Sequence, residues 1–296
     1  MNDQANRLRK LIESVKTKET EGEATAQVKE KKYDSRVIAI SSGKGGVGKT
    51  SIAVNLAIAL QSMGKRVALI DADLGLANVD VVLGLVPRYN MFHLIAGQKT
   101  IEDITLIGPK GIKVLSGGSG AMDLVNLDDK SIKKLIELLM ILNQTTDYII
   151  IDTGAGINRS VLSFIEATNE LIIVVTPDPT SITDAYAVIK NTHSKEKMIK
   201  VVVNQTESAR EGQAVYEKLS TAAEKFLEAK ISYLGFIMND KRVKKSVRAQ
   251  TPFYLEYPDS SASQSIALIA HQLENIEPVK QKRTFGGFIK RLLVGG

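Results

Sequence analysis

The apolar and polar positions of residues 36–276 follow two different periods. Short runs that are apolar almost throughout indicate strands buried on both faces. They occupy Val37–Ser41, Arg66–Ile70, Ile112–Leu115, Tyr148–Ile151, Leu171–Thr176, Lys200–Val203 and Ile231–Phe236. Between them, a helical pattern covers Lys49–Ser62, Asp128–Leu142, Ser160–Ala167, Ser181–His193, Arg210–Glu228, Lys241–Arg248 and Ser260–Asn275. This alternation predicts an α/β fold, a mostly parallel twisted sheet with helices on both faces.

The two ends of the chain do not share this alternation. Residues 16–35 contain almost no large apolar side chain, so we expect a flexible linker that cannot bury enough surface to offset the entropy of ordering. Residues 277–283 are expected to form a second linker, and residues 284–296 a final helix. The first segment, residues 1–15, has the pattern of one short helix, with Asp3 as its cap and Leu8, Leu11, Ile12 and Val15 on one face.

The composition excludes several classes of protein. The 296 residues include no cysteine, which excludes disulfide frameworks, zinc fingers, iron–sulfur clusters and cysteine nucleophiles and fits a reducing compartment. The three histidines share no close spacing, so a metal site built from them is not expected. No run of 18 apolar residues exists, and the first residues lack the apolar core of a secretory signal.

Positive charge gathers near the C-terminal end. Of the net charge of +6, residues 279–296 contribute +5, from Lys280, Lys282, Arg283, Lys290 and Arg291 with no acid. Apolar side chains in the same stretch fall on one helical stripe, at Phe285, Phe288, Ile289, Leu292 and Leu293. Such a stripe beside cations such as Lys290 and Arg291 is typical of an amphipathic helix lying on an anionic membrane surface. A helix docked on the protein's own core is the alternative.

One loop carries most of the recognisable chemistry. Residues 43–50 match the phosphate-binding pattern G-x-x-x-x-G-K-[ST], between an apolar strand and a helix as that motif requires. The backbone N–H groups of such a loop and the positive end of the helix bind phosphate oxygens. Lys49 can reach the β- and γ-phosphates, and Thr50 can ligate Mg²⁺. The predicted phosphate-binding set is Gly43, Lys44, Gly45, Gly46, Val47, Gly48, Lys49, Thr50 and Ser51.

The same glycines permit a second interpretation. Gly43, Gly45 and Gly48 also fit G-x-G-x-x-G, and Asp71 lies where the ribose-binding acid of a dinucleotide site would be. The pair Lys49-Thr50 argues against it, because a dinucleotide-binding turn has no use for these residues. Asp152 follows an apolar strand, as a Mg²⁺-associated carboxylate does in a P-loop enzyme. The sequence therefore predicts a P-loop NTPase.

Several motifs resemble the MinD/ParA family of ATPases, over residues 36–275. KGGVGKT, with Lys44 before the second glycine, resembles the family's deviant Walker A motif. Asp71-Ala72-Asp73 resembles its switch region, and IIIDTGAGI resembles its Walker B segment, where many members have Pro in place of Gly154. The resemblance implies binding and hydrolysis of ATP with Mg²⁺. It also implies contacts to adenine from the residues that match the family's base-binding strand end and loop, Asn204, Met238 and Asp240.

The resemblance further assigns roles to charged residues. In the family, a lysine at the position of Lys44 reaches across a dimer to the partner's phosphates, which couples ATP binding to formation of a homodimer. Asp73 is the candidate for orienting the attacking water and accepting its proton, with indirect Mg²⁺ ligation as the alternative. Asp71 is expected in the Mg²⁺ shell or in a structural role. The predicted metal-associated residues are thus Thr50, Asp71 and Asp152.

The N-terminal segment indicates a subgroup. DQANRLR, residues 3–9, resembles the DQAxxLR element of the FlhG (FleN or YlxH) proteins, which regulate flagellar number and placement, and GFIKRLLVGG is similar to the membrane-targeting tail of MinD. The resemblance implies stimulation of the SRP-type GTPase FlhF and a meeting with the flagellar switch complex. We expect a cytoplasmic protein that joins the inner face of the cell membrane in its ATP state. The predicted GTPase-activating residues are Asp3, Gln4, Leu8 and Arg9.

One basic segment permits other partners. The predicted helix at residues 241–248 holds Lys241, Arg242, Lys244, Lys245 and Arg248, which could contact DNA, acidic lipid or a protein, or form a solvated face. DNA is disfavoured because no recognition motif for nucleic acid is present and the chain before the tail is nearly neutral. A ParA-type DNA-partitioning ATPase and a division-site MinD-type ATPase remain the alternatives. The absence of cysteine disfavours an iron–sulfur scaffold ATPase.

Overall fold

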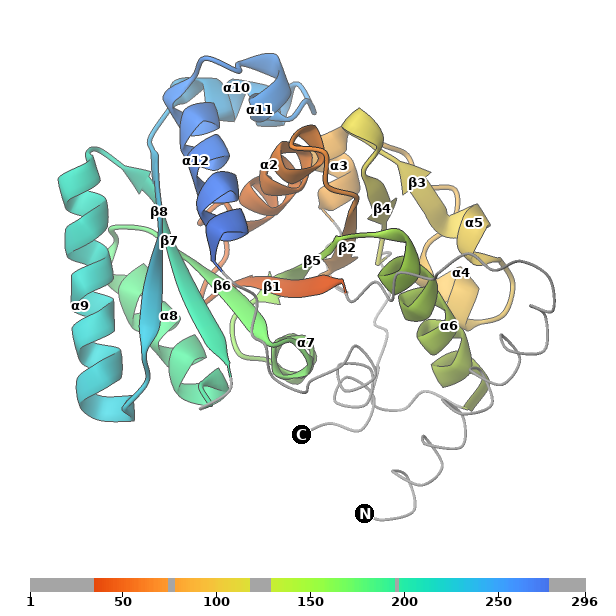
Figure 1. The fold of residues 1–296 in the computed structure, drawn as a ribbon, viewed down its shortest axis with the longest axis horizontal. Coiled ribbons are helices and arrows are strands. Elements are labelled where there is room, and N and C mark those ends of the chain that lie inside the picture. Colours follow the sequence, from red (N-terminus) through yellow and green to blue (C-terminus); the bar gives the residue numbers. More distant parts are fainter. Residues whose placement is uncertain (1–34, 74–77, 118–128, 195–196, 277–296) are drawn as a thin grey trace, which may run out of the picture.

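A single sheet organises the molecule. The computed structural model describes residues 35–73, 78–117, 129–194 and 197–276, with side chains described from residue 137 onward in the third range. Within them, eight strands pair in the order β3-β4-β2-β5-β1-β6-β7-β8, all parallel except the β3–β4 pair (Figure 1). The strands are β1 (Arg36–Ser42), β2 (Val67–Ala72), β3 (Thr105–Ile107), β4 (Lys113–Leu115), β5 (Tyr148–Ala155), β6 (Glu170–Val175), β7 (Met198–Thr206) and β8 (Ile231–Met238).

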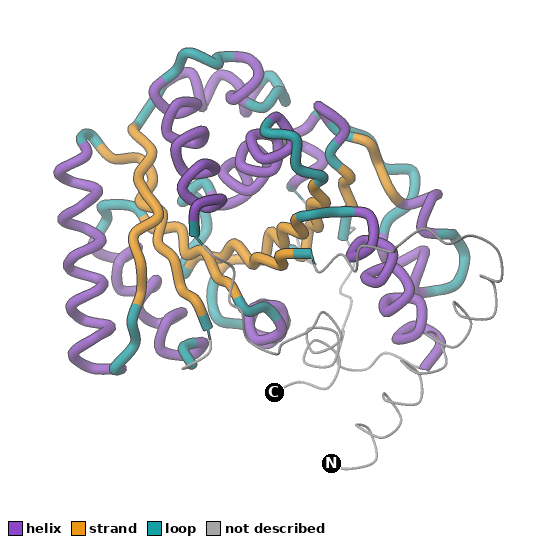
Figure 2. Tube along the Cα trace, in the orientation of Figure 1, coloured by secondary structure: helices purple, strands orange, loops and turns teal. Residues whose placement is uncertain are grey.

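Helices cover both faces of this sheet, as the alternation of elements predicts (Figure 2). One face packs against α2 (Lys49–Ser62), α3 (Val79–Leu83), α11 (Phe253–Glu256) and α12 (Ser261–Asn275), with α10 (Lys241–Arg248) beside them. The other face packs against α4 (Met91–Ile95), α6 (Asp129–Thr145), α7 (Arg159–Ala167), α8 (Pro179–Thr192) and α9 (Ala209–Leu227). The short α5 (Ile101–Ile104) leads into β3. The predicted α/β class is confirmed.

Successive residues of the central strands point into different cores. Ile38 and Ile40 of β1 pack in the cluster around α2 and α12, whereas Ala39 between them packs against α7 and α8. All three side chains are buried, because β1 has a neighbour on each edge and helices on each face. This arrangement explains why the strand reads as a continuous apolar run.

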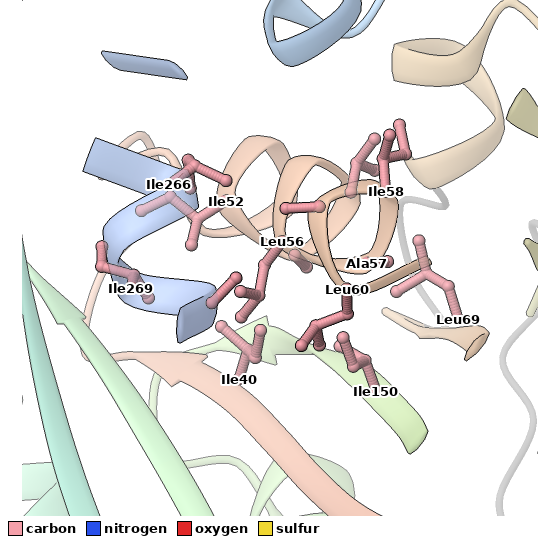
Figure 3. Close-up of a cluster of buried hydrophobic side chains, with 14 of the residues drawn as sticks. Ile40, Ile52, Leu56, Ala57, Ile58, Leu60, Leu69, Ile150, Ile266 and Ile269 are labelled. Atoms are coloured by element: carbon pink, nitrogen blue, oxygen red, sulfur yellow. The ribbon is translucent and has the colours of Figure 1, made fainter. Parts of the chain in front are cut away.

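Helix α2 is buried on nearly all sides, which fixes the loop at its start. Its residues from Ile52 to Leu60 have almost no exposed surface. Figure 3 shows Leu56 and Leu60 facing Ile40 and Ile150 of the sheet. Beside α2, on the same face of the sheet, Ile266 and Ile269 of α12 complete the contact. Each such side chain contributes about 2 kcal/mol of burial free energy, so the helix and the loop before it are held firmly.

The seven predicted strands and seven predicted helices are all present, with ends that differ by a few residues. The pattern missed β3 and the short helices α3, α4, α5 and α11, because three to five residues are too few to show a period. Ser35, the last residue of the predicted linker, is buried and its hydroxyl donates to the carbonyl of Thr146 at 2.8 Å. The predicted segments 1–15, 277–283 and 284–296 lie outside the described residues, as do residues 16–34 of the predicted linker.

Candidate nucleotide site

The predicted phosphate loop joins β1 to α2 at the carboxyl edge of the sheet. From β1 the chain first builds the side of the sheet that holds β5, β2 and β4, and later the side that holds β6, β7 and β8. Open α/β sheets bind their ligands at such a topological switch point. Gly46 and Gly48 have φ angles of 79° and 89°, which favour glycine. Gly48 is the N-cap of α2, and no side chain caps this helix. The first N–H groups of α2 therefore point at the loop without an intrahelical acceptor, an arrangement suited to phosphate.

A polar side chain from β7 touches this loop. The Asn204 amide donates from Nδ2 to the carbonyl oxygen of Val47 at 2.7 Å. A Cβ atom on Gly48 would lie 2.4 Å from that same nitrogen. Gly48 is thus required twice, for its backbone angle and for the close approach of Asn204.

Gly48→Ala is expected to reduce ATP affinity at least tenfold and to destabilise the fold by about 1–3 kcal/mol, because the methyl group adds a left-handed penalty to a clash. Calorimetric titration with ATP and a thermal unfolding curve measure the two effects. Gly45→Ala is the matched control, since a Cβ there meets nothing within 4 Å and its φ angle is ordinary. Equal losses in the two variants would contradict the role of the Asn204 contact.

A buried ion pair lies beneath the loop. Lys49 Nζ is 2.7 Å from Asp152 Oδ1, and both side chains are buried. Burial raises the pKa of Asp152, while the Lys49 ammonium opposes that rise. Asp152 Oδ2 and the Ser51 hydroxyl are buried and have no hydrogen-bond partner in the part of the chain that the structure describes. A carboxylate oxygen left over in this way fits a hydrated Mg²⁺, which favours one or two carboxylates together with phosphate oxygens.

The first switch aspartate shapes the backbone around it. Asp71 is fully buried, and it pairs in register with Asp152 across β2 and β5. Its Oδ1 accepts from the Asp73 N–H at 3.0 Å, and its Oδ2 accepts from Asn78 at 2.9 Å and Val79 at 3.1 Å. The pKa of Asp71 is raised to about 6, because burial and the nearby Asp152 charge together outweigh the backbone hydrogen bonds, which lower it. Asp71 therefore holds the residues on both sides of segment 74–77; its predicted place near the metal stays a prediction.

The second switch aspartate lies against the Walker B segment. A Cβ atom on Gly154 would be 3.6 Å from Asp73 Oδ1 and 3.2 Å from Val161 Cγ2. The Asp73 charge also raises the pKa of Asp152, after the larger effect of burial. The structure thus brings Asp71, Asp73 and Asp152 to one place beside Lys49. No group of three or more acidic or histidine residues in metal-binding arrangement occurs within the described ranges.

Lys44 is held apart from these residues. Its Nζ lies 3.1 Å from Asp178 Oδ2 and donates to Thr180 Oγ1 at 2.9 Å. These partners belong to the junction between β6 and α8, and the Lys44 side chain remains 31% exposed. The two lysines of the motif therefore occupy different environments, Lys49 inside the site and Lys44 at its surface.

A pocket of about 330 Å³ opens next to the loop and contains the predicted adenine contacts Asn204, Met238 and Asp240. Asp240 is the N-cap of α10 and forms an ion pair with Arg242 at 2.9 Å. The pattern did not single out the apolar lining, Ile52, Ile237, Val243, Val247 and Phe253. The spacing of Val243 and Val247, four residues apart on a basic helix, is a sequence signal that could have indicated this lining. Helix α10 is therefore a wall of the pocket, with Lys244 and Arg248 at its rim.

The remaining predicted site residues belong to the two ends of the chain. The GTPase-activating set Asp3, Gln4, Leu8 and Arg9 lies outside the described residues. So does the membrane-binding set Phe285, Phe288, Ile289, Lys290, Arg291, Leu292 and Leu293.

The sheet order, the glycine loop opening α2 and the acidic strand ends define a P-loop nucleotide-binding protein. A family model described as "ParA: NUBPL iron-transfer P-loop NTPase" matches residues 34–274. The chain belongs to the MinD/ParA family of P-loop ATPases. The words "iron-transfer" belong to the description of the family model. This chain has no cysteine with which to bind an iron–sulfur cluster.

Relatives and solved structures agree with this assignment. The antiactivator FleN of Pseudomonas aeruginosa is 39% identical over 87% of this chain and 93% of FleN. The flagellum site-determining protein YlxH of Helicobacter pylori is 35% identical over 99% of both chains. A chain of the MinC:MinD complex of Aquifex aeolicus is 31% identical with a TM-score of 0.65, over 84% of this chain and 100% of that one. MinD of Pyrococcus horikoshii, complexed with Mg-ADP, is 26% identical with a TM-score of 0.66, over 84% and 99%.

Proposed function

We propose that the protein is an ATP-driven molecular switch that regulates the number or placement of flagella. The observation that carries the switch is the separation of the two loop lysines, Lys49 buried against Asp152 and Lys44 at the surface. The flagellar role is supported by the similarity to FleN and YlxH. It is also supported by the DQANRLR segment at residues 3–9.

Separate groups of residues bind the phosphates and the base of ATP. The N–H groups at the start of α2 hold the phosphates, and Lys49 exchanges its contact with Asp152 for the β- and γ-phosphate oxygens. The base enters the pocket beside Asn204, whose Nδ2 is committed to Val47. The amide oxygen of Asn204 then remains to accept from an exocyclic amine, which adenine has at the position where guanine has a carbonyl.

Hydrolysis needs a positioned water and neutralised charge. Thr50 and Asp152 would hold Mg²⁺, which supplies positive charge to the transferring phosphoryl group when it is bound. Asp73 orients the attacking water and accepts its proton. Asp71 keeps Asp73 in place through the bond to the Asp73 N–H.

Lys44 makes the site responsive to a second copy of the chain. From the surface it can reach the phosphates of a partner molecule, and the γ-phosphate adds the charge that favours this contact. ATP then favours the homodimer and ADP favours the single chain. The two states differ in which groups surround the β6–α8 junction.

The C-terminal tail would make membrane binding depend on whether the protein is a single chain or a dimer. One short amphipathic helix binds lipid weakly, whereas two copies in a dimer bind more tightly by effective concentration. Within the described ranges, no helix has the length and hydropathy needed to span a bilayer. The amphipathic pattern of residues 284–296 is the basis for the proposed location of the ATP state, which is peripheral attachment at the inner face of the cell membrane.

The N-terminal segment would act on FlhF, with contacts from Asp3, Leu8 and Arg9 that place Gln4 at the GTPase site, where a glutamine can position water. The full chain is expected to raise the GTPase rate of FlhF at least tenfold, and Gln4→Ala is expected to remove that increase. A phosphate-release assay with FlhF alone as baseline measures both rates, and Gln27→Ala in the same N-terminal region is the matched control. Stimulation that survives Gln4→Ala would contradict the role of Gln4. No stimulation by the full chain would favour a division-site MinD-type role or a ParA-type DNA-partitioning role instead.

A further inference from the structure

An asparagine is buried in the middle of α2. Asn55 has no exposed surface, although asparagine is a poor helix former and a buried amide is costly unless it is hydrogen-bonded. Its Nδ2 donates to the Ser51 carbonyl at 2.7 Å, one turn back in the same helix. Its Oδ1 accepts from the backbone N–H of Tyr254 at 2.8 Å, across 199 residues of sequence. Asn55 therefore joins the start of α2 to the short helix α11.

The bond from Asn55 supplies a cap that α11 does not have of its own. The N-cap residue of α11 is Pro252, whose side chain has no acceptor for the N–H two or three residues on. Tyr254 is the second residue of α11, so its N–H is one of those left over, and Asn55 Oδ1 accepts from it. At the other end, the buried Ser263 hydroxyl donates to the carbonyl of Tyr257, the C-cap residue, at 2.7 Å. Helix α11 is thus held at both ends by buried side chains of its neighbours.

The two elements that Asn55 joins both line the pocket next to the phosphate loop. Ser51 and Ile52 contribute to it from α2, and Phe253 contributes from α11. Phe253 directly precedes Tyr254 in the chain, and its side chain is buried. The Asn55 bond therefore fixes Phe253 relative to the first turn of α2, where the phosphates are proposed to bind.

We propose that Asn55 is a positioning residue that sets the spacing between the phosphate loop and the side of the base pocket that Phe253 forms. The inference rests on the proposed binding of an adenine nucleotide and needs neither the dimer nor the flagellar role. The phosphates and the base of a nucleotide are joined, so both bind well only where the two parts of the site are held at the matching distance. Without Asn55, the Tyr254 N–H has no acceptor and α11 is no longer tied to α2. The N–H groups that bind phosphate are unaffected.

The expected effect is therefore confined to the nucleoside part of the ligand. Asn55→Leu removes both amide bonds and keeps a side chain of similar size. The dissociation constant of ADP is expected to rise about five- to tenfold, the factor that corresponds to one hydrogen bond of ordinary net strength. Pyrophosphate, which occupies the phosphate loop alone, is expected to bind within about twofold of its wild-type affinity.

Calorimetric titrations of the full chain with Mg²⁺ and either ADP or pyrophosphate test the proposal. Phe253→Leu alone should also weaken ADP and spare pyrophosphate. If Asn55 acts through Phe253, the variant with both changes should lose little more ADP affinity than the weaker-binding single variant. Losses that add in full would show that Asn55 acts independently of Phe253 and would overturn the proposal.

Asn191→Leu is the matched control. Asn191 Nδ2 donates to the Ala187 carbonyl at 2.8 Å, one turn back in α8, which is the same local bond that Asn55 makes in α2. Asn191 is exposed, so its substitution tests the loss of that local bond without the loss of a contact between elements. Wild-type affinity for both ligands is expected, and weakening of ADP equal to that in Asn55→Leu would contradict the proposal.

A second variant covers the case in which Asn55→Leu does not fold, as a thermal unfolding curve would show. Ser263→Ala loosens α11 from its other end and is expected to weaken ADP and spare pyrophosphate in the same way. If the folded variant binds ADP as tightly as the wild type, or loses ADP and pyrophosphate equally, the spacing role is wrong and the proposed switch stands. A wild type that binds ADP but not pyrophosphate also overturns the inference. A wild type that does not bind ADP defeats the proposed function itself.

Discussion

Lys44→Ala is expected to abolish ATP-dependent dimerisation and to lower ATP turnover about a hundredfold or more, while the chain stays folded. The reason is positional. Lys44 lies at the surface, with its ammonium group on Asp178 and Thr180, so its removal leaves the buried Lys49–Asp152 pair and the core intact. Removal of one positive donor from a phosphoryl-transfer site costs about two to three orders of magnitude in rate.

Sedimentation with ATP, a phosphate-release assay and a thermal unfolding curve measure the three parts of this prediction. Lys190→Ala is a suitable control, because Lys190 is an exposed lysine near the other end of α8. Unchanged sedimentation of Lys44→Ala in ATP, relative to the wild type, would contradict the role of Lys44 between two chains.

Asp73→Ala is expected to bind ATP with nearly wild-type affinity and to hydrolyse it at least about a hundredfold more slowly, so that dimers accumulate. Asp73 adjoins the Walker B segment at Gly154, beside Asp152, and does not belong to the loop that holds phosphate. Loss of a group that orients and deprotonates water lowers the rate by about 10²–10⁴ without removing binding energy.

Calorimetric titration separates binding from turnover in this variant, and sedimentation reports the accumulated dimer. Asp259→Ala, which removes an exposed carboxylate outside the site, controls for the loss of charge alone. Wild-type turnover in Asp73→Ala would remove Asp73 from the mechanism, and loss of ATP binding would assign it to the phosphate or metal site.

The parts of the site that the sequence predicts are those written in consecutive residues. The phosphate loop at residues 43–51 is one segment between a strand and a helix, so its geometry is largely local. The contact between Lys44 and Asp178 is different, because it exists only where β1 and β6 are neighbours in the sheet. The same holds for Asn204 and Val47, which are 157 residues apart. No local pattern could predict these pairs.

The apolar pattern of the sequence also could not predict the charged side chains that are buried in the sheet. Lys200 lies in an apolar strand, β7, and is completely buried. It pairs with Glu170 of β6, which Arg36 of β1 also contacts at 2.7 Å. Although burial opposes it, Arg36 and Lys200 hold the pKa of Glu170 below its usual value. Three strands that adjoin at their starting ends thus satisfy one another's charges, which only the strand order reveals.

Sedimentation of the full wild-type chain with Mg²⁺, first with ADP and then with a non-hydrolysable ATP analogue, tests the central claim most directly. The account predicts a single chain with the diphosphate and a pair of chains with the triphosphate, at the same protein concentration and salt. The same molecular mass with both nucleotides, once calorimetry has shown that both are bound, would contradict it.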